Sequence, residues 1–285
     1  MSTPNSNDGK TPISFEFFPP RTEQGRENLQ ATWRELATLK PEFFSVTFGA
    51  GGTTQDGTFD TVKAISTDCG IEAAPHLSCV GSTRDNIAAL LQQYKDAGIK
   101  RIVALRGDLP SGMMSTGEFA YANELVSFIR EQHGDHFHLE VAAYPEFHPQ
   151  ANSPDEDLAN FVRKVESGAN SAITQYFFNA DAYFDFVERC EAVGVEVPIV
   201  PGIMPITNYT QLARFSDACG AEIPRWIRQR LAAYENDEAS LLAFGHDVIV
   251  ELCSELLDGD APGLHFYSLN KSGPTSRIVR DLGLA

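Results

Sequence analysis

Ionisable and polar side chains recur at the ends of short hydrophobic runs in this sequence, and Glu16 is the clearest of them. Phe15 and Phe17 flank it, and Phe18 follows. Aromatic neighbours exclude water from a carboxyl group, and desolvation disfavours the charged form, so we expect the pKa of Glu16 to be raised. A carboxyl group that stays protonated near neutral pH can act as a general acid. The alternative is a structural glutamate that pairs with an arginine at a strand end.

Further polar residues share this placement at the ends of hydrophobic runs. Asp108 follows Arg106 and Gly107, and the glycine lets a ligand approach the backbone closely while the carboxylate faces a cationic or proton-bearing group. The other members are Thr47, His76, Tyr144, His148 and Gln175. A buried carboxylate or amide is costly unless it has a partner, so this many polar residues at such positions indicate a site. Any one of them alone could equally be a satisfied polar residue at a barrel rim.

A third group of polar residues falls on one predicted helix. Asp157, Asn160 and Lys164 are spaced at i, i+3 and i+7 and therefore share a face, with Arg163 beside it. Cations suit phosphates, and amides or carboxylates suit sugar hydroxyls, so this face could bind an adenosine diphosphate group. From the spacing alone, a solvated charged face is the better interpretation.

The elements that must position these residues alternate regularly along the chain. Eight β-branched or aromatic runs start mostly about 30 residues apart, the length of one strand–helix–strand unit, and segments of helical periodicity separate them. The runs are Ile13–Phe18, Phe43–Phe48, Ala73–Cys79, Arg101–Arg106, Leu139–Tyr144, Ser171–Phe178, Pro198–Met204 and Gly263–Leu269. We predict an α/β fold, a (β/α)8 TIM barrel, with extra helices around Pro224–Tyr234 and Glu238–Leu257 before the last strand. Ser82 or Thr83 is expected to cap the third helix.

Length and composition limit the alternatives. Residues 1–11 are predicted to be a flexible N-terminal tail without a secretory signal, and residues 12–285 a single TIM-barrel catalytic domain. The 22 Lys and Arg against 39 Asp and Glu give a formal charge of −17, which argues against nucleic acid or an anionic membrane as partner. No apolar run approaches the ~20 residues that span a bilayer.

The cysteines and histidines show no metal-binding pattern. The five cysteines are odd in number and widely spaced, which predicts free thiols in a cytoplasm and no metal site. His133, His136 and His138 cluster near one predicted loop; metal binding is one interpretation, and a strand-entry loop at the opposite face of the barrel is the better one.

Eight strings in order along the chain resemble one known family. They are Ser14–Pro20, Ser45–Ala50, Ala73–Leu77, Ile102–Pro110, Val141–Pro149, Ala172–Phe178, Val200–Pro205 and His265–Asn270. On these strings the sequence resembles bacterial methylenetetrahydrofolate reductases. The resemblance implies a TIM barrel that holds FAD, oxidises NAD(P)H, with NADH favoured, and reduces 5,10-methylenetetrahydrofolate to 5-methyltetrahydrofolate for methionine synthesis. It also implies a ping-pong order and a homo-oligomer, either a dimer or a tetramer.

The same resemblance implies a role for individual residues. Glu16 matches the general acid that assists opening of the folate ring, and Asp108 matches a carboxylate near both pterin and flavin. Gln175 matches an amide that contacts either substrate, and Phe215 an aromatic that stacks on nicotinamide or folate. The implied substrate contacts are Thr47, Asp108, Gln175, Gln211, Phe215 and Lys271. The implied FAD contacts are Phe48, Ala50, His76, Arg106, Gly107, Asp108, Ala122, Tyr144, His148, Ala151, Asp157, Asn160, Arg163 and Lys164.

Two departures and two alternatives accompany this interpretation. Relatives often carry Tyr where this chain has Phe48, which removes a hydroxyl contact, and can carry Arg where it has Lys271, which replaces a bidentate fork by a point charge. One alternative is a binding or regulatory barrel that holds folate or flavin without catalysis; the other is a flavin-free barrel lyase. Retention of Glu16, Asp108 and Gln175 together argues against a pure binder, which has no need of a buried acid.

Overall fold

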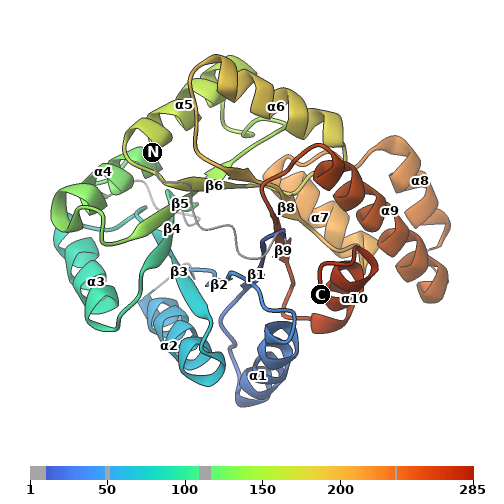
Figure 1. Ribbon diagram of the computed structural model, residues 1–285, viewed down its shortest axis with the longest axis horizontal. Helices are drawn as coiled ribbons and strands as arrows, with labels where there is room; N and C mark the ends of the chain where they lie inside the picture. Colours follow the sequence, from blue (N-terminus) through green and yellow to red (C-terminus); the bar gives the residue numbers. More distant parts are fainter. Residues whose placement is uncertain (1–10, 49–51, 109–116, 235) are drawn as a thin grey trace.

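The computed structural model describes residues 11–48, 52–108, 117–234 and 236–285, and in it strands and helices alternate around a ring (Figure 1). Residues 1–10 of the predicted tail lie outside the described part. The strands are β1 Ile13–Phe17, β2 Phe43–Val46, β3 Glu72–Ser78, β4 Arg101–Leu105, β5 His138–Ala143, β6 Ser171–Thr174, β7 Ile199–Val200, β8 Gly202–Ile203 and β9 Leu264–Tyr267. The helices are α1 Glu23–Ala37, α2 Gly52–Cys69, α3 Arg84–Asp96, α4 Ala122–His133, α5 Pro154–Glu166, α6 Ala180–Ala192, α7 Tyr209–Cys219, α8 Arg225–Ala233, α9 Glu238–Asp258 and α10 Ser272–Asp281.

The strands form one parallel sheet that curls into a nearly closed barrel. Their order is β7-β6-β5-β4-β3-β2-β1-β9-β8, and every strand pairing is parallel. The two ends of this order, β7 and β8, are separated in the chain only by Pro201. Because α8 and α9 precede β9, the predicted (β/α)8 barrel with extra helices before its last strand is confirmed. No helix in the described ranges is long and apolar enough to cross a membrane.

The seventh predicted strand, Pro198–Met204, differs from the prediction because it is divided into β7 and β8. Pro201 has no N–H to donate to a strand ladder, although its carbonyl accepts a hydrogen bond of 3.0 Å from His265 N. Gly202 N instead donates to Thr174 Oγ1 at 2.9 Å. A Cβ on Gly202 would lie 2.1 Å from Thr174 O and 2.7 Å from the Tyr267 ring, so only glycine fits here. The absence of a side chain at Gly202 lets the Tyr267 ring pack against this backbone.

Local sequence explains where the helices begin. Thr83 caps α3, as one of the two predicted candidates, by accepting a 3.2 Å hydrogen bond from Asn86 N. Ser153 caps α5 by accepting from Glu156 N at 3.2 Å, and Pro154 occupies the first turn, where no N–H is needed. These caps satisfy backbone donors that the helix itself leaves unpaired.

Two hydrophobic clusters lie on opposite sides of the sheet. The larger lies between the sheet and the helices and includes Phe15, Phe17 and Phe44. The smaller consists of Phe43, Ala74, Val103 and Ile173, with Leu105 packed against it. Successive side chains of a strand point to opposite faces, so the second cluster belongs to the barrel interior. The interior is therefore only partly apolar, and polar groups occupy both of its ends.

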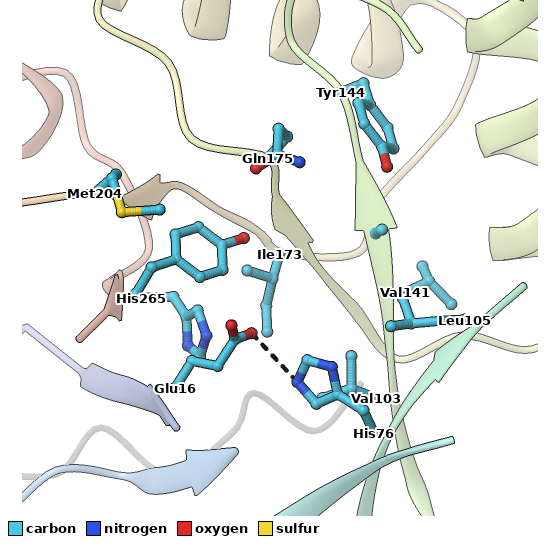
Figure 2. Close-up of a pocket in the computed structure, with 12 residues that line it drawn as sticks. Glu16, His76, Val103, Leu105, Val141, Tyr144, Ile173, Gln175, Met204 and His265 are labelled. Atoms are coloured by element: carbon cyan, nitrogen blue, oxygen red, sulfur yellow. Dashed lines mark ion pairs between the residues drawn. The ribbon is translucent and has the colours of Figure 1, made fainter. Parts of the chain in front are cut away.

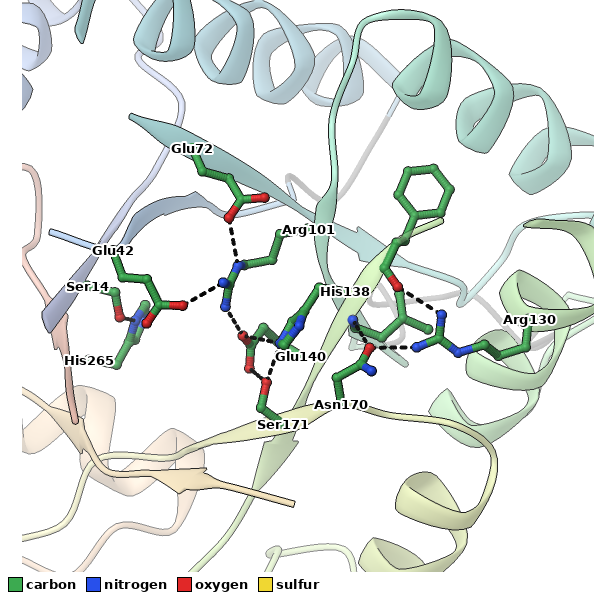
Figure 3. A network of polar contacts seen from close by, with 12 residues as sticks. Ser14, Glu42, Glu72, Arg101, Arg130, His138, Glu140, Asn170, Ser171 and His265 are labelled. Atoms are coloured by element: carbon green, nitrogen blue, oxygen red, sulfur yellow. Dashed lines mark hydrogen bonds and ion pairs between the residues drawn. The ribbon is translucent and has the colours of Figure 1, made fainter. Parts of the chain in front are cut away.

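The amino-terminal end of the barrel interior is closed by ion pairs (Figure 3), and the opposite end holds a cavity (Figure 2). The Arg101 guanidinium lies 2.6 Å from Glu140, 2.6 Å from Glu42 and 3.1 Å from Glu72. Burial alone would raise the pKa of Glu140, but hydrogen bonding to His138 and the charge of Arg101 outweigh it and lower the pKa to about 2. Glu140 is therefore ionised although it is buried, and the positive charge of Arg101 helps to keep it so.

We expect Arg101→Met to destabilise the fold strongly, since it leaves Glu140 ionised and buried without its cation. A loss of about 3–5 kcal/mol in the free energy of unfolding is expected from urea denaturation at neutral pH. The native pKa of Glu140 lies below its ordinary value of 4.5, so its contribution is present above that value and lost as the pH falls toward about 2.

The matched control for Arg101→Met is the double variant Arg101→Met/Glu140→Gln. The second substitution removes the buried negative charge that Arg101→Met leaves without a cation. It should recover part of the lost stability. Equal stability of Arg101→Met and the parent protein would contradict this account of the barrel end.

Candidate active site

A cavity of about 270 Å³ lies at the carboxyl ends of the strands (Figure 2). Its wall draws on most of the strands and on the residues that follow them: Glu16, His76, Val103, Leu105, Val141, Ala142, Tyr144, Ile173, Gln175, Met204, His265 and Tyr267. Most of this wall is apolar, and a few convergent polar groups fix orientation, as in small-molecule sites generally.

Glu16 projects from β1 into this cavity, and burial raises its pKa to about 8. The raised pKa was predicted, but the reason differs from the one expected. Phe15 stacks on Phe266 at a ring distance of 5.7 Å and belongs to the cluster under the helices, on the other face of β1. The barrel interior, and not the neighbouring phenylalanines, excludes water from the carboxyl group. At neutral pH Glu16 is largely protonated.

His76, on β3, also lines this cavity, and its side chain lies next to that of Glu16. Its Nε2 lies 3.3 Å from Glu16 Oε2, without hydrogen-bond geometry, and has no hydrogen-bond partner in the described part of the chain. Burial, with a smaller effect of His265, lowers the pKa of His76 to about 3. The imidazole is therefore neutral, and the proton of the pair stays on Glu16.

His265, in the middle of β9, repeats this pattern. Its Nδ1 lies 2.7 Å from Ser14 Oγ, whereas its buried Nε2 has no partner among the residues that the structure describes. Burial lowers the pKa of His265 to about 4. Buried polar atoms are nearly always hydrogen-bonded, so two orphaned ring nitrogens on one cavity indicate that a ligand completes the site.

Gln175 and Tyr144 form the outer part of the wall. Gln175 N donates to Ala143 O at 2.8 Å, which ties the end of β6 to the end of β5. Tyr144 packs edge-on against His148 at a ring distance of 4.5 Å. Burial and then the nearby charge of Asp108 raise the pKa of Tyr144 to about 12. Asp108 itself is exposed, and its charge acts on Tyr144, a residue of the cavity wall.

The Arg106–Gly107 turn is held tightly against β3. Gly107 has a φ of +84°, and a Cβ there would lie 1.8 Å from Ser78 Oγ. Ser78 Oγ in turn donates to Arg106 O at 2.9 Å. Ser78 therefore packs closely against this backbone on the side where a Cβ would lie. Arg106 Nη2 donates to Gln150 Oε1 at 2.6 Å, which holds its guanidinium beside the loop after β5.

The predicted polar face of α5 is turned largely toward the barrel. Asp157 Oδ2 accepts from His148 N at 2.9 Å, and Lys164 Nζ donates to Ala142 O, which belongs to the cavity wall. Burial lowers the pKa of Lys164 to about 8. Arg163 donates to Asn160. The solvated-face interpretation is therefore wrong for Asp157 and Lys164.

The remaining predicted residues lie away from the cavity wall. Thr47 and Phe48 are half-buried after β2, Ala122 begins α4, and Ala151 N donates to His148 O at 2.9 Å. Gln211 and Phe215 are half-buried on α7, and Lys271 is exposed as the N-cap of α10. Ala50 lies outside the described residues. The structure thus brings Glu16, His76, Tyr144 and Gln175 together around one cavity, and the remaining predicted residues are not part of its wall.

His265 and Tyr267 were not predicted as site residues, although both lie in the string His265–Asn270 that resembles the family. Tyr267 OH donates to Thr174 O at 2.7 Å, so it supports the strand end that carries Gln175. The available signal was a histidine and a tyrosine in an otherwise apolar strand. His133 and His136 pack edge-on against Phe137 before β5, and the described residues contain no group of three or more potential ligands suited to a metal ion.

A parallel (β/α)8 barrel with a cavity at the carboxyl ends of its strands, into which a few polar side chains project, is the arrangement of TIM-barrel enzymes. The sequence profile of the methylenetetrahydrofolate reductase family matches residues 3–283. The chain belongs to this family and is an oxidoreductase.

Individual relatives agree with this membership. The chain is 40% identical over 276 residues to the 5,10-methylenetetrahydrofolate reductase of Salmonella typhimurium, covering 97% of this chain and 92% of that protein. It is 37% identical over 292 residues to methylenetetrahydrofolate reductase (NADH) 1 of Zea mays, covering 98% of this chain and 49% of that protein. A solved structure from Clostridium thermocellum, of a protein that binds two copies of 5-methyl-5,6,7,8-tetrahydrofolic acid, shares the fold at a TM-score of 0.66 and 18% identity, covering 96% of this chain and 94% of that one.

Proposed function

We propose that this chain reduces 5,10-methylenetetrahydrofolate to 5-methyltetrahydrofolate, with FAD as cofactor and NADH as electron donor. The observation that carries the proposal is the protonated Glu16 in a cavity beside two neutral histidines. A reductive ring opening needs a proton for the leaving nitrogen, and this carboxyl group holds one near neutral pH. The family membership supports the substrate.

The residues around the cavity suit FAD. The orphaned Nε2 atoms of His76 and His265 offer hydrogen bonds inside the barrel. Near the loop after β5, Arg106, Lys164 and His148 provide cations and donors for phosphates, and Asp157 and Asn160 suit sugar hydroxyls. When bound, FAD supplies the hydride transfer between nicotinamide and folate. The further FAD contacts that we propose are Phe48, Ala50, Gly107, Asp108, Ala122, Tyr144, Ala151 and Arg163.

Glu16 is proposed as the general acid of the folate step. The substrate's methylene bridges N5 and N10, and the product keeps its one-carbon group on N5, so the bond to N10 breaks. Glu16 would donate its proton to N10 as this bond breaks. His76 does not compete for the proton, because its pKa is only about 3. Asp108 would face the cationic folate that results and stabilise its charge.

The approaches to the cavity are proposed to bind the two substrates. Gln175 and Phe215 would contact either of them, Thr47 the nicotinamide, and Gln211 and Lys271 the folate. NADH is favoured over NADPH because two plant relatives are named as NADH enzymes. Since one cavity would serve both substrates, we propose that they alternate in a ping-pong order.

We also propose a cellular setting. The five cysteines are free, and similar proteins come from bacteria, which supports a reducing cytoplasm. In that setting the product would supply methyl groups for methionine synthesis, and the chain would work as a homo-oligomer.

Initial-rate kinetics test the proposed order. With both NADH and methylenetetrahydrofolate varied, double-reciprocal plots should give parallel lines, as a ping-pong reaction requires. Intersecting lines would contradict alternate occupation of one cavity. Absence of any NADH-dependent formation of 5-methyltetrahydrofolate would contradict the proposed activity itself.

A further inference from the structure

Helix α8 is an unusually basic surface on an acidic protein. Arg225, Arg228 and Arg230 are all exposed, and the helix carries no acidic residue, although the chain has a formal charge of −17. Within the described ranges, none of the three arginines forms an ion pair. Only Ile227 and Leu231 of this helix are buried. The helix lies on the outside of the molecule (Figure 1), and its three arginines are exposed to solvent.

Helix α9, which packs beside α8, carries the opposite charge. Asp247, Glu251, Glu255 and Asp258 are exposed and spaced at i, i+4, i+8 and i+11, so they form one stripe along the helix. No ion pair joins this stripe to any part of the chain that the structure describes. Three free cations and four free carboxylates thus lie on adjacent helices without neutralising one another.

Aromatic side chains join the two charged surfaces. Trp226 is 53% exposed and contacts Phe244 of α9 edge-on at a ring distance of 6.0 Å. Phe244 precedes Asp247 by three residues and therefore lies on the same side of α9 as the acidic stripe. Leu242 is also exposed. A large exposed tryptophan between complementary charges is typical of the centre of a protein interface.

We propose that α8 and the acidic stripe of α9 form a twofold interface between two copies of this chain. In a twofold interface the same surface meets itself after a half-turn, so its two halves must complement each other. The arginines of one α8 would then lie along the carboxylates of the other copy's α9, and the reverse contact would form at the same time. The Trp226 side chains would be buried between them.

Charge complementarity selects a second copy over other partners. Nucleic acid or an anionic membrane would meet the arginines but would be repelled by the acidic stripe next to them. A second copy presents both charges in the required order. The interface does not depend on the reductase chemistry, so the two proposals can fail separately.

The test is a charge exchange between the two helices, read as the mass of the assembly in solution. The first variant is Arg225→Glu/Arg228→Glu/Arg230→Glu. The second is Asp247→Lys/Glu251→Lys/Glu255→Lys. Each alone sets like charges against each other, so each should show half the mass of the parent assembly. Mixed in equal amounts, the two should form a heterodimer across this interface, because both contacts become attractive again.

Controls separate the interface from a general effect of charge. Lys63→Glu/Lys95→Glu, on exposed positions of α2 and α3, should keep the parent mass. Trp226→Ala should weaken association about tenfold or more. Circular dichroism of each variant should match the parent. The proposal would be overturned by a monomeric parent at low salt, by a first variant that keeps the parent mass, or by a mixture of the two charge variants that fails to associate.

Discussion

Glu16→Gln is expected to abolish most of the folate half-reaction while leaving reduction of the flavin by NADH close to the parent rate. Hydride transfer from nicotinamide to flavin needs no proton from Glu16, whereas opening of the folate ring does. Loss of a positioned general acid costs about 10²–10⁴-fold in rate. The two half-reactions, measured separately by anaerobic rapid mixing, should therefore diverge by that factor.

The NADH half-reaction serves as an internal control for this variant, because a misfolded site or a lost cofactor would slow both steps. Equal losses in both half-reactions, in a folded protein that retains flavin, would contradict the general-acid role of Glu16. Equal rates in the parent and the variant would contradict it as well.

The pH dependence supplies an independent reading of Glu16. Its pKa of about 8 predicts that the parent's folate half-reaction falls as the pH rises through about 8, when the acid form is lost. The direction in which the free energy of unfolding changes with pH also follows, because the pKa of Glu16 in the folded chain lies above the ordinary 4.5. Between those values the folded chain holds a proton that the unfolded chain has released, so stability declines as the pH rises. Glu16→Gln should remove both dependences.

Gly107→Ala is expected to be among the most damaging single-methyl additions to the fold. Its φ of +84° is strained for alanine, and the new Cβ would lie 1.8 Å from Ser78 Oγ. Backbone strain of about 1–3 kcal/mol and overpacking of about 1–3 kcal/mol would add in the free energy of unfolding measured with urea. Because this turn carries Arg106 and Asp108, flavin affinity should fall as well.

Gly98→Ala is the matched control for the packing contribution. Gly98 has a similar φ of +79°, but apart from its own backbone and its two chain neighbours no described atom lies within 4 Å of an added Cβ. Gly98→Ala should therefore be destabilised by backbone strain alone, without the cost of overpacking. Adding Ser78→Ala to Gly107→Ala should recover part of the extra stability that Gly107→Ala loses relative to Gly98→Ala. Equal destabilisation by Gly98→Ala and Gly107→Ala would show that the contact with Ser78 has no energetic effect.

The fold was predictable from sequence because each strand–helix unit carries its own periodicity. The exception is the strand that divides at Pro201, where the proline interrupts the ladder and Gly202 admits the Tyr267 ring. That contact joins β8 to β9 and Thr174, residues distant in the chain, so a local pattern could not reveal it.

The candidate site was predictable in part for a similar reason. Glu16 was identified as a buried acid, but its phenylalanine neighbours point to the other face of the strand, and the barrel interior removes the water. His265 had no visible role, because only the closed barrel brings its strand beside His76. For α5, periodicity identified one face but not the element that it meets; that Lys164 reaches Ala142 depends on packing.

The proposed function requires this barrel to transfer electrons from NADH to methylenetetrahydrofolate through a bound flavin. The most direct measurement is the visible absorbance spectrum of the purified chain under anaerobic conditions, first alone, then with NADH, then with methylenetetrahydrofolate. We expect flavin absorbance bands that bleach with NADH and return with the folate. A chain that neither carries FAD nor takes it up, or whose flavin NADH leaves oxidised, would contradict it.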